Sequence, residues 1–318
     1  STLLGKRFDE SNIAEFRELR GLLEAQSRTI NTPAFLIMLM APSLRHFPWI
    51  STAWKTIIAC RDNLFAFMKK QIEDHEAEID FSVEQESTDV CEAFLRERAA
   101  VTKKDGHEGL WSKHQLLNVL VDLWMGGLET TTGTLGWTIA YLLHHPEVAV
   151  KMREEMDSAL QGSDRLIRSD DRQKLPYCQA VIMETQRCAN ILPVNLGRVL
   201  SKDTNIGGFA VARGTGVIAQ ISSVLWDARL FPQPRAFKPE RFIDENGALI
   251  TPDSWLPFSV GARRCPGESL ARAELFLFTT NLVRRFHLRP SEAGLPCIEK
   301  SATAVVKPST HTLKVVPV

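Results

Sequence analysis

The chain has 318 residues, 44% of them hydrophobic, and its 38 Lys and Arg residues balance 38 Asp and Glu residues. An ordinary apolar fraction excludes disorder as the general state, and zero net charge argues against a partner such as nucleic acid that is bound by neutralising phosphates. The length allows one large domain or two smaller ones, and small or apolar partners fit this composition best.

The six cysteines stand at positions 60, 91, 178, 188, 265 and 297, with no Cys-x-x-Cys pair and no Asn-x-Ser/Thr sequence anywhere. This spacing predicts neither a disulfide framework nor a structural zinc site, and it indicates a reducing, cytosol-facing environment. The longest apolar run, Ala34 to Pro42, is too short for a bilayer, which needs about 20 apolar residues. The opening at Ser1 resembles neither a signal nor a transit peptide.

The first part of the chain, to about Ala100, has helical periodicity. Apolar residues at three-to-four spacing predict helices over 11–25 and 52–75. The apolar stretch 32–42 and the following segment 46–50 have two interpretations, a core connector or a surface that dips into a membrane interface. Residues 111–145 contain no proline and predict a helix of about 50 Å, a length found only in large proteins.

Two prolines mark the next helix starts, so helices are expected over 146–160 and 175–189. Val, Ile and Leu residues interrupted by glycines then predict short strands and turns over 192–221. A proline-rich loop and a Gly/Arg-rich segment lead to a last helix over 268–286, with strand-like segments at 304–306 and 312–316. We expect a single, mainly α domain over 1–318 with a small β region.

One candidate site is the segment Phe258-Ser-Val-Gly-Ala-Arg-Arg-Cys-Pro-Gly267. Cys265 lies just before a predicted helix, whose free amides and positive end stabilise a thiolate, and Arg263 and Arg264 add to that field. Gly261 and Gly267 permit turns or a close approach to a flat partner. A buried structural cysteine is the alternative, whereas a lone thiolate suggests an axial ligand to a cofactor metal.

A second feature is Gly126-Gly-Leu-Glu-Thr-Thr-Thr132, in the middle of the long predicted helix. Two glycines and three threonines are poor helix formers, and a bond from the Thr130 hydroxyl to the Gly126 carbonyl would loosen the helix there. The Thr130 hydroxyl, the Glu129 carboxylate and the glycine backbone would then face the same small space. Close packing against a neighbouring helix is the alternative.

Two further motifs are ordinary by themselves. Glu184 and Arg187 share one helix face, and alone such a pair indicates a solvated surface contact. Arg241 stands between aromatic residues in Phe237-Lys-Pro-Glu-Arg-Phe242, and alone this segment is typical of a turn.

The joint order of these motifs is more specific than any of them. Gly-Gly-x-Glu-Thr-Thr, Glu-x-x-Arg, Pro-Glu-Arg-Phe and Phe-x-x-Gly-x-Arg-x-Cys-x-Gly follow one another as in a cytochrome P-450, a haem-thiolate monooxygenase. The resemblance covers essentially the whole chain, including the opening Gly5-Lys-Arg-Phe-Asp9, and is greatest to the microsomal branch. It implies the C-terminal two-thirds of the cytochrome P-450 fold.

The resemblance also implies a cofactor site for haem b (iron protoporphyrin IX). Cys265 matches the axial iron ligand, Arg263 and Arg198 match haem-propionate partners, and Phe258 is expected beside the thiolate. The residues Phe258, Gly261 and Gly267 complete the cofactor-binding set. Glu184, Arg187 and Arg241 resemble a buried charge cluster beneath the haem.

The resemblance assigns proton delivery to Glu129 and Thr130, which match the pair that serves iron-bound O2 in the family. A lipophilic small molecule is the expected substrate. By analogy its contacts are Leu123, Met125, Gly126, Gly127, Val194, Leu196 and Thr310. Electrons are expected from NADPH through a cytochrome reductase, which could meet a basic surface at Arg263, Arg264 and Arg272; a solvated helix face is the alternative for Arg272.

The sequence also departs from the family pattern. Gly126 and Leu128 stand where the family more often has Ala and Thr, and none of the seven tryptophans has an Arg four residues on, so the family's Trp-x-x-x-Arg motif is missing. The family's membrane anchor and first helices are not found either, so we expect a truncated chain from an enzyme of the cytosolic face of the endoplasmic reticulum membrane. The alternatives are a catalytically silent haem-binding or regulatory protein and a helical scaffold without cofactor.

Overall fold

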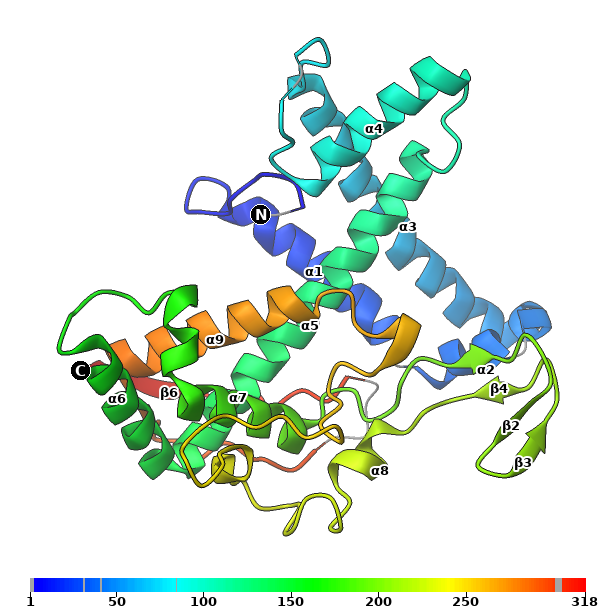
Figure 1. The fold of residues 1–318 in the computed structure, drawn as a ribbon. Coiled ribbons are helices and arrows are strands. Elements are labelled where there is room, and N and C mark those ends of the chain that lie inside the picture. The colour runs from blue at the N-terminus through cyan, green and yellow to red at the C-terminus, as the bar shows by residue number, and fades with distance from the viewer. Residues whose placement is uncertain (1–2, 31, 41, 84, 301–304) are drawn as a thin grey trace. The chain divides into compact units, whose positions relative to one another are not determined.

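The computed structural model describes residues 3–30, 32–40, 42–83, 85–300 and 305–318 (Figure 1). Its contacts gather in two units, residues 1–126 and 127–318, and helix α5 (Lys113–His144) runs through the division. Each unit is treated by itself. The prediction of one domain over the whole chain stays a prediction.

The first unit is built of helices. They are α1 (Ile13–Ile30), α2 (Pro33–Met40), α3 (Pro48–Glu78), α4 (Val90–Asp105) and the start of α5, with a 3-10 turn at Pro42–His46. The predicted helices over 11–25 and 52–75 correspond to α1 and α3, both of which are longer than expected. Pro48 at the first turn of α3 explains its earlier start, because a proline there loses no helical hydrogen bond.

The apolar stretch after α1 is helical in part and contributes to a core. Met38, Ile50 and Ile57 are buried together, with Phe35 and Trp54 packed against them. Phe47, at the N-cap of α3, is 54% exposed. The stretch therefore supplies a local core, as the connector interpretation expects, while one aromatic ring next to it faces outward.

The second unit packs three helices on the end of α5. These are α6 (Pro146–Leu160), α7 (Pro176–Ala189) and α9 (Glu268–Arg285), and Trp137, Met152 and Phe276 are almost fully buried between them. Eleven of the fourteen residues of α7 are buried. The starts of α6 and α7 at prolines confirm the expected boundaries, and α7 forms the centre of this unit.

Three small antiparallel sheets lie among the described residues of the second unit. β1 (Arg198–Val199) pairs with β4 (Gly216–Val217), β2 (Thr204–Ile206) with β3 (Phe209–Val211), and β5 (Phe286–Pro290) with β6 (Leu313–Pro317). Short helical segments lie at Ser169–Lys174, Ile221–Leu225 (α8), Pro239–Phe242 and Gly261–Arg263. The predicted class, mainly α with a small β region, is confirmed.

Two local predictions were wrong. The segment predicted as a strand over 304–306 contains Ala304, which lies outside the described residues, and its residues 305–306 are not in a strand. The Val306 amide donates instead to the Ile191 carbonyl, at 2.8 Å. The strand that pairs with the C-terminal β6 is β5, which was not predicted and which begins at Phe286, where the last helix was expected to end. No helix within the described ranges is long and apolar enough to cross a membrane.

Candidate functional site

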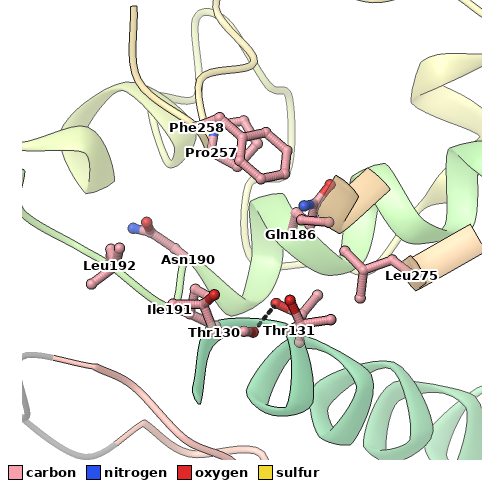
Figure 2. A pocket seen from close by; sticks show the side chains of 11 residues that line it. Thr130, Thr131, Gln186, Asn190, Ile191, Leu192, Pro257, Phe258 and Leu275 are labelled. Atoms are coloured by element: carbon pink, nitrogen blue, oxygen red, sulfur yellow. Dashed lines mark hydrogen bonds between the residues drawn. The ribbon is translucent and has the colours of Figure 1, made fainter. Parts of the chain in front are cut away.

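A small pocket in the second unit joins four segments that are far apart in the sequence (Figure 2). It encloses about 40 Å³, and Phe258 lies across this space from Thr130 and Thr131 of α5. The lining comprises Thr130, Thr131, Thr134, Gln186, Asn190, Ile191, Leu192, Pro257, Phe258, Ala271 and Leu275. Two residues that the sequence singled out, Thr130 and Phe258, therefore meet at one pocket.

Helix α5 stays continuous through the glycine and threonine segment. The Thr134 hydroxyl donates to the Thr130 carbonyl at 2.8 Å, and the Thr132 hydroxyl donates to the Leu128 carbonyl at 2.6 Å. Such bonds satisfy hydroxyls within the helix and slightly weaken its backbone ladder. The expected bond from Thr130 to Gly126 stays a prediction.

The two glycines of α5 are not sites of close packing. A Cβ atom built at Gly126 or Gly127 would meet no atom within 4 Å in the described chain, and both residues are exposed. The alternative of close packing on a neighbouring helix is therefore not met at the two glycines, whereas Thr131 of the same segment is buried. Bare backbone on an open face accommodates a flat ligand, because no side chain stands in its way.

The neighbouring acid, Glu129, is mostly buried and carries a counterion. Its side chain is 13% exposed and forms an ion pair with Lys307, which comes from the segment before β6. No sequence pattern pointed to Lys307, since a lysine in a C-terminal segment is ordinary. The acid that the motif predicts is thus held in the same unit as the pocket.

The loop before α9 folds back on itself around Cys265. The Cys265 amide donates to the Phe258 carbonyl at 2.9 Å, and Arg264 N donates to Gly261 O at 3.1 Å. Gly261 has φ +79°, a conformation that favours glycine. These bonds fix a tight turn and leave the Cys265 side chain half-buried at its end.

Cys265 lies near the free amides at the start of α9. Gly267 is the N-cap, so Pro266 lies just outside the helix and not at its first position. A Cβ atom on Gly267 would stand 4.0 Å from the Cys265 sulfur, which shows how closely the backbone passes the thiol. A helix N-terminus favours negative charge, so this position suits a thiolate.

The two arginines expected at haem carboxylates are exposed. Arg263 lies in the 3-10 turn of the cysteine loop, and Arg198 lies in β1 opposite Val217. Neither guanidinium has a hydrogen-bond or ion-pair partner among the described residues. Two unpaired arginines are suited to bidentate binding of carboxylates.

Arg272 is not a plainly solvated helix residue. Its guanidinium lies 4.7 Å from the ring centroid of Trp255 and 5.4 Å from that of Phe258, and it forms an ion pair with Glu268 at 2.7 Å. Stacking of this kind orders an arginine on an aromatic surface. The solvated-face alternative is therefore wrong, and Arg272 supports the position of Phe258 beside the pocket.

Glu184, Arg187 and Arg241 form a cluster beneath the proline-rich loop. Glu184 and Arg187 are fully buried and joined at 2.7 Å, and Arg241 reaches Glu184 at 3.0 Å. Arg187 also donates to the carbonyls of Leu225 and Pro234, at 2.9 and 2.8 Å. The interpretation of a solvated pair, drawn from the spacing alone, was wrong because carbonyls of α8 and of the proline-rich loop cover the guanidinium.

The charges of this cluster reinforce one another. Burial acts to lower the pKa of Arg187, but the hydrogen bond to Glu184 and the nearby negative groups outweigh burial, so its pKa is raised. The adjacent Cys188 thiol is neutral, because burial raises its pKa to about 12. Arg187 therefore stays protonated in the cluster, with an inert thiol beside it.

The expected substrate contacts are divided between the two units. Leu123, Met125 and Gly126 belong to the first unit, and Gly127, Val194, Leu196 and Thr310 belong to the second. In the second unit, Leu196 is 84% exposed. The Asn195 amide donates to the Ser259 hydroxyl at 2.7 Å, which ties this segment to the cysteine loop.

Sequence reasoning missed two polar residues of the pocket, Gln186 and Asn190. Asn190 ends α7 in a left-handed conformation, with φ 41° and ψ 61°, and is 4% exposed. Its side-chain nitrogen has no hydrogen-bond partner in the part of the chain that the structure describes. An asparagine just after a predicted helix is a signal for the helix end, but its burial depends on the cysteine loop and α5.

The residues of this site fit a haem held by one thiolate. The described residues contain no group of three or more His, Cys, Asp or Glu side chains that would hold a metal ion, whereas Cys265 is half-buried at a helix start. Open glycine backbone and unpaired arginines suit a flat group with carboxylates. The pocket volume of about 40 Å³ has room for only a few waters, so the fit to haem depends on the cysteine, the glycines and the arginines.

Comparisons with known proteins agree with a haem site. The family model for cytochrome P450 matches residues 1–315. The chain is 33% identical to cytochrome P450 2A5 of Mus musculus over 92% of its length and 58% of that protein. It is 33% identical to cytochrome P450 2A11 and 32% identical to cytochrome P450 2C5 of Oryctolagus cuniculus, over 100% of its length and 63% of each.

These features define a mainly helical protein with the cytochrome P450 fold. The chain belongs to the cytochrome P450 family. Membership of this family implies a haem cofactor and haem-dependent oxidation, without naming a substrate. The chain spans about three-fifths of the length of these curated relatives.

Proposed function

We propose that the protein containing this chain is a haem-thiolate monooxygenase that inserts one oxygen atom of O2 into a lipophilic small molecule. The single observation that carries the proposal is the half-buried Cys265 at the start of α9, in a loop that matches the family motif. Bound haem would supply the redox chemistry, and the chain supplies orientation and electrostatics.

In this proposal Cys265 holds the haem iron as a thiolate. The free amides at the start of α9 favour its negative charge, and the open turn at Gly261 leaves the approach clear. Arg263 and Arg198 bind the haem carboxylates, which their unpaired guanidinium groups support. Phe258, steadied by Arg272, packs beside the sulfur and keeps water from it.

Glu129 and Thr130 are the proposed proton-handling pair. The Glu129 carboxylate accepts a proton from solvent and passes it on through water to the Thr130 hydroxyl. The position of Thr130 on the pocket and the burial of Glu129 support these roles. The segment Leu123 to Gly127 and residues Val194, Leu196 and Thr310 are proposed to contact a lipophilic substrate, because most of them are apolar or side-chain-free.

Electrons are proposed to come from NADPH through a cytochrome reductase at the endoplasmic reticulum membrane, on its cytosolic face. Arg263 and Arg264 are exposed and offer positive charge to an acidic donor. Arg272 contributes less than the sequence suggested, because it pairs with Glu268 and stacks on Trp255. The membrane surface and the reductase are partners of the full-length protein in this proposal.

The test of the proposed function is a carbon monoxide difference spectrum of the reduced protein that contains this chain. We expect the red-shifted Soret band of thiolate ligation, and its loss in Cys265→Ala. Cys297→Ala, at an exposed cysteine, is the matched control and should keep the band. An unchanged band in Cys265→Ala would reject the ligand assignment.

A further inference from the structure

The segment just before β6 is fastened along helix α5. The Trp137 indole nitrogen donates to the Val306 carbonyl at 3.0 Å, and the Val306 amide donates to the Ile191 carbonyl at 2.8 Å. Val306 itself is 4% exposed. We call residues Val306–Pro308 the C-terminal strap. Both backbone groups of its first residue, the carbonyl and the amide, are hydrogen-bonded.

The last residue of the strap is fixed by contact with α5. Pro308 fits against Gly136 so closely that a Cβ atom there would stand 2.9 Å from the proline ring. A contact of this kind needs glycine, since any larger residue would push the strap outward. The strap is thus anchored on each side of Lys307.

Lys307 points its ammonium group at Glu129. Glu129 precedes Gly136 by seven residues, two helical turns, so both lie on the same face of α5. The Glu129 side chain is 13% exposed and that of Lys307 is 47% exposed. The Lys307 side chain is therefore partly solvated, and its ammonium group pairs with a carboxylate that is mostly buried.

This ion pair loses less conformational entropy on forming than an ordinary surface pair does. Exposed pairs contribute little because two mobile side chains must be ordered. Here the backbone on both sides of Lys307 is already fixed by Val306 and Pro308, and Glu129 lies on a continuous helix. A carboxylate removed from water also depends more on its counterion than an exposed one does.

We propose that Lys307 is a positioning residue that pairs with the Glu129 carboxylate and holds it in place next to Thr130 on α5, and thereby sets the efficiency of proton delivery. This inference depends on the proposed function. In the productive reaction, substrate, O2, two electrons from NADPH and two protons give hydroxylated product and water. When proton delivery fails, O2, two electrons and two protons leave as hydrogen peroxide, and the substrate is unchanged.

The first test measures the pairing without using activity. Hydrogen exchange of the Val306 amide should become about twofold to fivefold faster in Lys307→Gln, because the ion pair helps to hold the strap closed. Lys314→Gln removes a lysine of β6 that pairs with the exposed Glu292, and it should leave the Val306 exchange rate unchanged. Equal exchange in Lys307→Gln and the unsubstituted protein would contradict the pairing.

The second test measures the peroxide formed per NADPH in the haem-loaded, full-length gene product with its reductase. We expect Lys307→Gln to raise peroxide about threefold to tenfold, a part of the roughly 10² to 10⁴ that a positioned proton donor contributes. Lys307→Arg should restore the normal ratio, since it keeps the charge. Lys307→Met keeps the apolar stem and should behave as Lys307→Gln does, which separates loss of charge from loss of packing.

The outcomes separate the two proposals. If Glu129→Gln leaves the peroxide ratio unchanged, the proton-handling role in the proposed function is wrong. If Glu129→Gln raises peroxide but Lys307→Gln and Lys307→Met match Lys314→Gln, the positioning role of Lys307 is overturned while the proposed function stands. The carbon monoxide spectrum of each variant confirms that the haem site has formed before the ratios are compared.

Discussion

The two groups of arginines in the second unit have opposite surroundings. Arg187 is fully buried, bonded to Glu184 and covered by loop carbonyls, whereas Arg263 and Arg198 are exposed and have no ion-pair partner among the described residues. A buried guanidinium that is fully satisfied within the chain holds structure together, and an unpaired one is available to a ligand. The charge cluster and the cysteine loop are therefore expected to respond to mutation in different ways.

The largest effect is expected at the buried pair. Arg187→Met leaves the Glu184 carboxylate buried without its main partner, and the free energy of unfolding should fall by about 3 to 5 kcal/mol. Denaturant unfolding measures this loss. Lys151→Met, which breaks the exposed pair with Glu240, is the matched control and should cost much less. A small change in Arg187→Met would contradict the structural role of the cluster.

Gly136→Ala is expected to have the next effect. The new Cβ atom would stand 2.9 Å from the Pro308 ring, so the C-terminal strap must shift, at a cost of about 1 to 3 kcal/mol. Thermal unfolding checks the loss. Gly133→Ala, one turn earlier in α5, has no atom within 4 Å of its added Cβ in the described chain and serves as control. Equal stability of the two variants would show that the strap is not in close contact with α5.

An intermediate case is the pair between Asp171, which is buried, and Arg165, which is half-exposed. The hydrogen bond from Arg165 lowers the pKa of Asp171 from 3.8 to about 2. The folded-state pKa is the lower one, so this stabilisation is present above pH 3.8 and is lost as the pH falls through about 2.

Because Arg165 is partly solvated, the contribution should be about 1 kcal/mol at neutral pH. Comparing the pH dependence of unfolding in Asp171→Asn with that of the unsubstituted protein measures it. Curves that stay parallel between pH 2 and 4 would contradict the assignment.

The sequence predicted the long helices of the second unit well because their signals are local. Pro146 and Pro176 mark helix starts, and the absence of proline over 111–145 predicted α5. The strand β5 could not be predicted in the same way, because Phe286–Pro290 continues directly from α9 and becomes a strand only by pairing with β6. Tertiary contacts decided that boundary.

The candidate site was predictable where a motif carried it and not elsewhere. The resemblance identified Cys265, Thr130 and Glu129 from residue order alone. The burial of Asn190 and the contact between Lys307 and Glu129 both depend on segments that are distant in the sequence, so no local pattern predicts them. Spacing alone even favoured the wrong interpretation of Glu184 and Arg187, since covering carbonyls arrive from a distant loop.

The smallest effect on stability is expected at the unpaired arginines, where the effect on the cofactor should be large. Arg263→Gln and Arg198→Gln remove charges without protein partners, so the free energy of unfolding of the cofactor-free chain should change by less than about 0.5 kcal/mol. Haem titration of the full-length protein should nevertheless weaken, because each variant loses a donor to a carboxylate. Arg289→Gln, at an exposed arginine of β5, is the matched control and should change neither quantity. If Arg263→Gln instead destabilised the protein as much as Arg187→Met does, Arg263 would have a structural role like that of the buried cluster. The contrast between buried, paired arginines and exposed, unpaired ones would then no longer identify the ligand site.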